Sequence, residues 1–190
     1  MEGAGVSFIL TREPGGTPVG NEIRQILLSS KNRDLPPLAE LFLYEADRAL
    51  HMSSVVKPAL SKGKWVLCDR FVDATTAYQG YARGQSLHVT TRLNEIASFS
   101  ISPDVTFLLD CPVSVGIQRA LKRNAESEVM GQDRFEQEKT VFHEAVRNGY
   151  LDIAKKNPDR FVVVDATHEE NRMEEIIFSV LESHLPLGRS

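Results

Sequence analysis

The sequence is poor in the features that mark membrane, secreted and nucleic-acid-binding proteins. Positive charge is not in excess, because 22 Lys and Arg face 26 Asp and Glu, for a formal net charge of −4. Apolar runs such as Phe161–Val164 are far too short to cross a bilayer. The N-terminal residues do not combine positive charge with an apolar stretch, so no secretory signal is expected. We therefore expect a protein that binds neither membranes nor nucleic acid.

Cysteine is also scarce, with two in 190 residues. Cys68 and Cys111 both lie in apolar, strand-like surroundings, which indicates buried thiols in a reducing compartment. With 42% hydrophobic residues the chain can build a core, and its length suits a single domain spanning residues 1–190. These features predict a single-domain cytoplasmic protein.

Four short apolar runs predict strands, and none alternates apolar with polar residues. Such runs are typical of strands buried on both faces of a parallel sheet. Between and after them, apolar residues recur at helical spacing. Strands that alternate with helices predict an α/β fold, with a doubly wound parallel sheet and right-handed crossovers. The four runs are Ser7–Leu10, Val66–Asp69, Val105–Asp110 and Phe161–Asp165.

Several helical patterns have features of their own. Pro58 predicts a break or kink in the segment that follows Pro36-Pro37. The stripe of Val89, Leu93 and Ile96 could face the sheet or a second subunit, and the core is the commoner place for such a stripe. Phe135 is predicted to open a long helix that continues through Ile153. The polar stretch Arg123–Asp133 has no apolar period and predicts a mobile loop between two helices.

Charged, hydroxylic and glycine-rich segments follow the four predicted strands. Ligands of a parallel α/β sheet bind beyond the carboxyl ends of its strands. Arginine forks suit phosphate oxygens, and carboxylates suit the Mg²⁺ that a nucleotide carries. Singly, each residue has a plain structural explanation as a cap, a turn or a solvated charge. Together they predict a nucleotide site from Thr11–Thr17, Asp69-Arg70, Asp110 and Asp165–Thr167, with Tyr44 and Arg48 one helical turn apart nearby.

Several motifs resemble those of bacterial thymidylate kinases, in the same order and spacing from Val6 onward. The resemblance implies a phosphate-loop nucleoside-monophosphate kinase, with strand order 2-3-1-4-5. It implies transfer of the ATP γ-phosphoryl group to dTMP, giving dTDP, with Mg²⁺ as cofactor and a homodimer as the assembly. The motifs are Thr11–Gly16, Glu22–Arg24, Cys68–Phe71, Ala77–Gly84, Pro103-Asp104, Asp133–Glu136, Phe142–Glu144 and Val164–Thr167.

The resemblance also implies which residues bind dTMP. Arg70 would hold the phosphate and take part in catalysis, and Asp69 would organise the metal. Tyr44 stands where the family usually has a Phe stacked on thymine, and a Tyr keeps that aromatic face. Arg48 would donate to a thymine carbonyl, and Tyr78 would disfavour a 2′-hydroxyl. The remaining implied dTMP-binding residues are Glu2, Glu13, Arg24, Thr75 and Gln79.

On the ATP side, the resemblance implies that Arg119 stacks on adenine. Arg123 and Arg134 would belong to a lid at about 119–136 and act in catalysis. Such arginines would neutralise charge on the transferring group and exclude water. The backbone of Gly3, Ala4 and Gly5 would bind the ATP phosphates.

The segment Glu2–Gly5 departs from the family's phosphate loop. A G-x-x-x-x-G-K-[ST] loop places its Lys on the β/γ-phosphates and its hydroxyl on Mg²⁺, whereas Gly5 runs directly into Val6. This departure predicts a sheet without the family's first strand, most of its phosphate loop and its first helix. Unpaired backbone groups beside such a gap cost about 1–3 kcal/mol each. For these 190 residues we expect turnover near background.

Three functions are compatible with the residues. The first is a dTMP kinase. The second is a catalytically inactive relative that binds the nucleotide without the phosphate-loop Lys and hydroxyl. The third is a kinase of the same fold that acts on another monophosphate, against which the Tyr44–Arg48 pair and Tyr78 argue.

Overall fold

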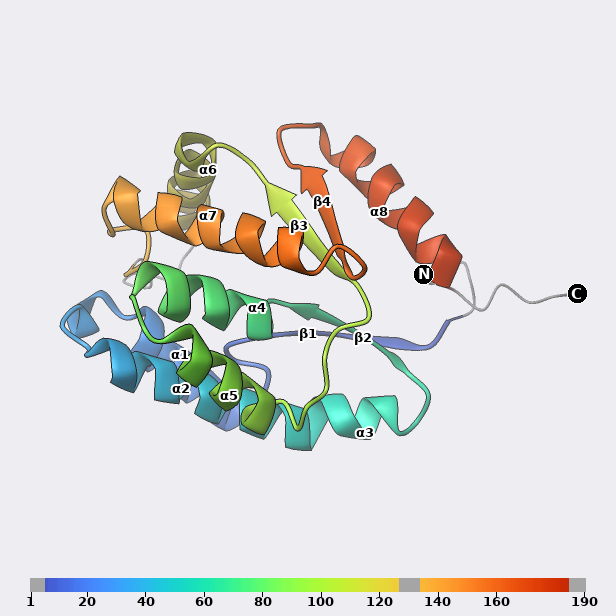
Figure 1. Cartoon of the computed structure of the whole chain (residues 1–190), viewed down its shortest axis with the longest axis horizontal. Helices are drawn as coiled ribbons and strands as arrows, with labels where there is room; N and C mark the ends of the chain where they lie inside the picture. Colours follow the sequence, from blue (N-terminus) through green and yellow to red (C-terminus); the bar gives the residue numbers. More distant parts are fainter. Residues whose placement is uncertain (1–5, 127–133, 185–190) are drawn as a thin grey trace, which may run out of the picture.

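The computed structural model describes residues 6–126 and 134–184 and shows parallel strands surrounded by helices (Figure 1). Strand β1 (Phe8–Arg12) pairs in parallel with β2 (Trp65–Asp69), in a register that ends with Arg12 opposite Asp69. Strand β3 (Thr106–Asp110) pairs in parallel with β4 (Phe161–Asp165). Each strand lies within two residues of its predicted range. The predicted α/β fold with parallel strands is confirmed.

The strands form two separate pairs, β1–β2 and β3–β4. In residues 6–126 and 134–184, no strand joins β2 to β3. Glu2–Gly5, where the sequence departs from the phosphate-loop pattern, lie outside the described residues. The predicted loss of a first strand, phosphate loop and first helix therefore stays a prediction.

Helix α1 (Pro18–Leu28) begins with a side-chain cap from Thr17. Thr17 has an extended backbone and its hydroxyl accepts a hydrogen bond from the Gly20 amide. Pro18 occupies the first turn, where its missing N–H costs nothing. This cap fixes where the chain leaves the glycine-rich segment after β1.

Helix α2 (Pro37–His51) does not break at Pro58. It runs through a π-helical turn, η3 (Met52–Val56), into α3 (Lys57–Leu60), so of the predicted break or kink the break is wrong. Proline removes one backbone donor and crowds the carbonyl four residues earlier. A wider turn just before Pro58 keeps the chain helical past this conflict.

The remaining helices cover the two strand pairs. The predicted helix from Phe135 onward starts later than expected, because Phe135 lies in a turn and α7 begins at Thr140. Helices α1 and α5 both pack against α2, while α7 packs against η4 and β3 (Figure 1). These elements are η2 (Ser30–Asn32), α4 (Val72–Thr75), η4 (Thr76–Ala82), α5 (Leu87–Ala97), α6 (Val113–Glu126), α7 (Thr140–Lys156) and α8 (Glu170–His184).

The core lies where α2, η4 and α7 meet. Leu27, Leu41 and Ala77 are fully buried. Tyr78 packs edge-on against Phe135, with ring centroids 5.5 Å apart, so the residues around the predicted site are also core residues. Among the described helices, none has both the length and the apolar character needed to span a membrane.

The apolar stripe on α5 does not face the core as expected. Ile96 is 60% exposed and Val89 is also exposed, while Leu93 is half-buried. The expectation that this stripe belongs to the core is therefore wrong for its two outer residues. A surface of this kind is available to a partner.

Candidate nucleotide-binding site

The carboxyl ends of β1 and β2 border a cleft of about 420 Å³. The Glu13 amide donates to the Asp69 carbonyl over 2.9 Å, which ties the two strand ends together. The segments after the first two strands therefore converge as predicted. Leu10, Thr11, Arg12, Gly15, Gly16 and Asp69 line this cleft.

Three guanidinium groups gather at the same edge of the sheet. Burial lowers the pKa of Arg24, and the positive charges of Arg12 and Arg70 lower it further. The Arg24 Nη1 donates to the Pro14 carbonyl over 3.0 Å, which holds α1 against the loop after β1. Cations crowded in this way repel one another unless an anion lies among them, so the arrangement fits a phosphate.

Arg70 is held in an unusual backbone conformation. Its φ of 69° lies in the left-handed region, which bulky residues rarely adopt. Its guanidinium lies over the Tyr78 ring, 4.3 Å from the centroid. Burial acts to lower the pKa of Arg70, but the phenols of Tyr78 and Tyr150 raise it above its ordinary value, so the side chain stays cationic.

Tyr44 and Arg70 share this site. Burial raises the pKa of the Tyr44 phenol, and the nearby positive charge of Arg70 acts in the opposite direction. Tyr44 is only 6% exposed and belongs to the core cluster. The predicted aromatic platform and the predicted phosphate ligand therefore lie together.

Arg48 is buried in a dense hydrogen-bond network. Its Nε donates to Glu13 Oε2 over 2.9 Å and its Nη2 donates to Thr75 Oγ1 over 2.9 Å. Its Nη1 donates to both Glu45 Oε2 and Asn94 Oδ1, over 2.9 and 2.7 Å. Four hydrogen bonds fix the guanidinium plane and leave one of its five N–H groups for a ligand.

His51 orients Glu13 through Oε1, the carboxylate oxygen that Arg48 does not contact. The His51 Nδ1 lies 2.8 Å from Glu13 Oε1 and must donate, because a carboxylate only accepts. The His51 Nε2 lies 2.6 Å from the Thr11 hydroxyl. Glu13, predicted to line the pocket, thus joins the end of β1 to α2.

Asp47 holds the glycine-rich loop. Its Oδ1 accepts from the Gly15 amide over 3.0 Å, and Oδ2 has no hydrogen-bond partner in the part of the chain that the structure describes. Burial raises the pKa of Asp47 to about 6. The loop needs glycine at position 16, because a Cβ there would clash with the His51 ring.

Glu40 is a site residue that sequence reasoning missed. It is fully buried, and it accepts from Gln79 Nε2 over 2.8 Å and from Arg134 Nη2 over 2.5 Å. Helical spacing could have found it, because Glu40 stands four residues before Tyr44 and eight before Arg48 on the same face of α2. Gln79 and Thr75, both among the dTMP-binding residues that the resemblance implies, are 1% and 2% exposed.

Arg134, predicted to act in catalysis, has its described contacts in the core. It is 3% exposed, and besides Glu40 it donates from Nη1 to the Leu27 carbonyl over 2.9 Å. Its backbone amide donates to the Leu28 carbonyl over 3.3 Å. These contacts cap the carboxyl end of α1.

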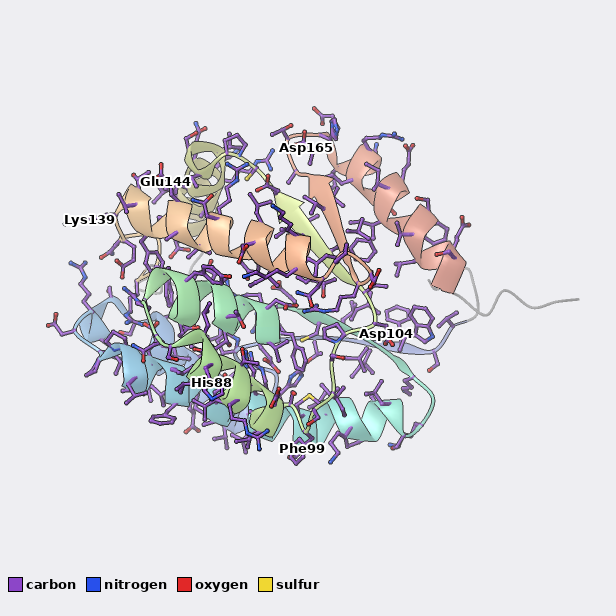
Figure 2. The ribbon with its side chains drawn as sticks, in the orientation of Figure 1. His88, Phe99, Asp104, Lys139, Glu144 and Asp165 are labelled. Carbon is purple, nitrogen blue, oxygen red and sulfur yellow. The ribbon has the colours of Figure 1, made fainter. Side chains whose placement is uncertain are left out.

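On the side of β3 and β4, Arg119 Nη1 donates to the Ala166 carbonyl over 2.7 Å. This contact brings Arg119 to the segment after β4, where Figure 2 shows Asp165 at the opposite end of the strand pair from Asp104. Asp110 receives two hydrogen bonds from Arg147, over 2.7 and 2.8 Å. Glu2, Gly3, Ala4, Gly5 and the side chain of Arg123 lie outside the described residues.

An α/β fold that gathers guanidinium groups and a buried aromatic ring beyond parallel strands is typical of nucleotide-binding enzymes that transfer phosphoryl groups. The thymidylate kinase family profile matches residues 1–177. The thymidylate kinase of Citrifermentans bemidjiense is 47% identical over 191 residues, covering 100% of this chain and 85% of the relative. That of Syntrophotalea carbinolica is 52% identical over 166 residues, covering 87% of this chain and 77% of the relative.

A solved structure agrees with these sequences. The crystal structure of thymidylate kinase from Ehrlichia chaffeensis is 34% identical and aligns with a TM-score of 0.70, covering 93% of this chain and 80% of that one. The chain therefore belongs to the thymidylate kinase family, whose reaction is the phosphorylation of dTMP to dTDP.

Proposed function

We propose that the chain binds dTMP at the carboxyl ends of β1 and β2, and that the γ-phosphoryl group of ATP is transferred there. The observation that supports this site is the convergence of Arg12, Arg24 and Arg70 beside Tyr44. Arg70 holds the phosphate, and its stacked, cationic guanidinium neutralises charge on the acceptor oxygen. Arg12 joins Arg70 and Arg24, which the resemblance implied as dTMP-binding residues, at this site.

The thymine base lies against Tyr44 on the α2 side of the pocket. Arg48 donates its remaining N–H to a base carbonyl, and its four other bonds hold that donor in place before the ligand arrives. Thr75 and Gln79 form the wall beside the base. We propose that Tyr78, whose ring lies under the Arg70 guanidinium, contacts the deoxyribose between the phosphate and the base.

The carboxylate of Asp69, at the end of β2, is the candidate metal ligand of the site. Asp69 is exposed and lines the cleft, beside Arg12 in the strand register. In the described part of the chain no three His, Cys, Asp or Glu side chains form a metal site. One carboxylate suits Mg²⁺ that arrives with ATP phosphates and keeps its waters. We propose that Asp69 holds such a magnesium–nucleotide complex, in which the metal neutralises phosphate charge.

For the ATP side we propose Arg119 as the adenine contact, Gly3–Gly5 as phosphate ligands and Arg123 as the cation of a lid at about 119–136. These parts belong to one doubly wound, phosphate-loop kinase domain spanning 1–190. Arg134 anchors the C-terminal part of this segment to the core instead of entering the reaction, because its donors go to Glu40 and Leu27.

One sequence observation favours a second candidate function. The 190 residues contain no Gly-Lys-Ser or Gly-Lys-Thr sequence, which the phosphate loop of such kinases uses for the β/γ-phosphates and Mg²⁺. A chain that binds dTMP without turnover is the alternative.

The assembly that we propose is a homodimer through the outer face of α2 and α5. These helices pack side by side, and their outward residues include Phe42 at 53% exposed and Ile96 at 60%. Leu38 and Val89 extend the same apolar character along each helix. Cys68 and Cys111 are free thiols, which supports a reducing, cytoplasmic setting.

Titration calorimetry with dTMP and with Mg-ATP, followed by an ADP-release assay, tests the proposal. We expect saturable dTMP binding, with dTMP preferred to AMP and CMP. Binding of dTMP accompanied by ADP release supports the kinase, whereas dTMP binding without ATP binding or turnover supports the alternative. A preference for AMP or CMP would contradict the proposed substrate.

A further inference from the structure

The orientation of the Gln79 amide is set by Glu40. Gln79 Nε2 donates to Glu40 Oε1 over 2.8 Å, and both side chains are buried. A carboxylate has no donor, so the amide must turn its NH₂ toward Glu40 whatever ligand is present. Among the described residues, none donates to the other end of this amide, Gln79 Oε1. Gln79 therefore offers a ligand an acceptor oxygen.

Two guanidinium groups keep Glu40 an acceptor. Arg134 Nη2 lies 2.5 Å from Glu40 Oε2, and Arg83 Nε lies 3.3 Å from Glu40 Oε1. Arg83 has a second partner in Glu138, 2.6 Å away, and lies over the Phe142 ring. Guanidinium groups can only donate, so both Glu40 oxygens accept hydrogen bonds, and Gln79 meets an accepting oxygen.

We propose that Glu40 is the positioning residue that sets base specificity, by fixing Gln79 Oε1 as a hydrogen-bond acceptor at the edge of the base. Thymine and uracil carry a donor at ring position N3, whereas the N3 of cytosine is an acceptor. An acceptor oxygen held at that edge binds the first kind of ring and leaves two acceptors facing each other with the second. This inference rests on the proposed dTMP site.

The test compares dTMP, dUMP and dCMP affinities by calorimetry in the unaltered chain and in Glu40→Gln. A glutamine at position 40 can donate or accept, so the Gln79 amide is free to rotate. We expect the dTMP-to-dCMP affinity ratio to fall by about 10- to 100-fold. The dTMP-to-dUMP ratio should stay the same, since those two bases share the N3 donor. A purely structural role for Glu40 would weaken all three ligands together.

Glu40→Gln leaves Arg134 without a carboxylate, so a charge-balanced variant is needed as a second arm. Glu40→Gln/Arg134→Met removes one charge of each sign, and Arg83 keeps Glu138. Arg160→Gln is the control, because it breaks a half-buried pair with Asp73 whose hydrogen bonds do not involve Glu40 or Gln79. We expect the dTMP-to-dCMP affinity ratio to fall in the double variant and to stay unchanged in Arg160→Gln.

Glu40→Asp should keep most of the dTMP-to-dCMP affinity ratio of the unaltered chain, because a carboxylate remains at that position. An unchanged ratio in both Glu40→Gln variants would overturn the proposal. Failure of the unaltered chain to bind dTMP would contradict the proposed function itself, which is a separate result.

Discussion

The inward face of α2 carries charged and polar side chains where a core helix is usually apolar. Glu40, Asp47, Arg48 and His51 are all at most 2% exposed. Each has a hydrogen-bond partner from a distant part of the chain, such as Glu13 for Arg48 and His51. Burying such groups is tolerable only when their hydrogen bonds are made, so this face holds the pocket rigid as well as polar.

The sequence could predict only part of this network. Tyr44 and Arg48 stand out because they lie one turn apart, whereas Glu40 and Asp47 were missed although they share the same face. A charge at helical spacing usually indicates a solvated surface, and only its partner shows that it is buried. The partner Glu13 is 35 residues from Arg48 in the chain, so no local pattern reveals the pair.

Arg70→Ala should weaken dTMP binding by about 10- to 100-fold, because charge-assisted hydrogen bonds contribute about 1.5–3 kcal/mol. Calorimetry at low and high salt measures this loss, which should be smaller at high salt. The matched control is Arg92→Ala, since Arg92 is an exposed arginine on α5 paired only with Glu95 among the described residues. Equal losses in the two variants would contradict the assignment of Arg70.

Asp47→Asn should change how stability depends on pH. Burial raises the pKa of Asp47 to about 6, against roughly 4 in an unfolded chain. The folded state therefore binds this proton more tightly, and the parent loses stability as the pH rises from 4 through 6. Asparagine lacks this loss and can still accept from the Gly15 amide.

Urea unfolding of both proteins at pH 4 and pH 7 measures the effect. Relative to the parent, Asp47→Asn should gain on the order of 2 kcal/mol between pH 4 and pH 7. The same stability difference at both pH values would show that Asp47 titrates as an exposed acid does.

At the scale of elements, the strands were predictable because each is a short, continuous apolar run bounded by turns. Pro58 was misleading, since the π-helical turn at Met52–Val56 lets the helix continue past it. Phe135 was misleading in another way. Its place at helical spacing from Phe142 reflects a shared aromatic cluster, while the chain around it is a turn.

The exposed residues Val89 and Ile96 on α5 belong to the proposed dimer interface. Ile96→Asp should convert the proposed dimer to a monomer, because a charge would be buried at the centre of an apolar contact. Light scattering after size-exclusion chromatography measures the mass, and Arg92→Ala on the same helix is the control. A dimer that persists in Ile96→Asp, with the parent also dimeric, would place the interface elsewhere.

At the scale of the whole molecule, the described strands form two pairs, and the proposed dTMP site is built around the β1–β2 pair. Its phosphate end comes from the segments after β1 and β2 together with α1, and its base end comes from α2 and η4. Helical periodicity and strand ends predicted which segments converge, since ligands of such folds bind beyond the carboxyl ends of the strands. The hydrogen-bond partners within the site could not be predicted from the sequence, because they join residues dozens of positions apart.

A crystal structure of the chain with bound dTMP is the sharpest test of the proposed site. We expect the phosphate within hydrogen-bond distance of Arg70 and Arg24, the base against Tyr44, and the N3 of thymine facing Gln79 Oε1. A dTMP molecule bound away from the carboxyl ends of β1 and β2, with Arg70 still stacked on Tyr78 and touching no ligand, would show that the site has been assigned wrongly.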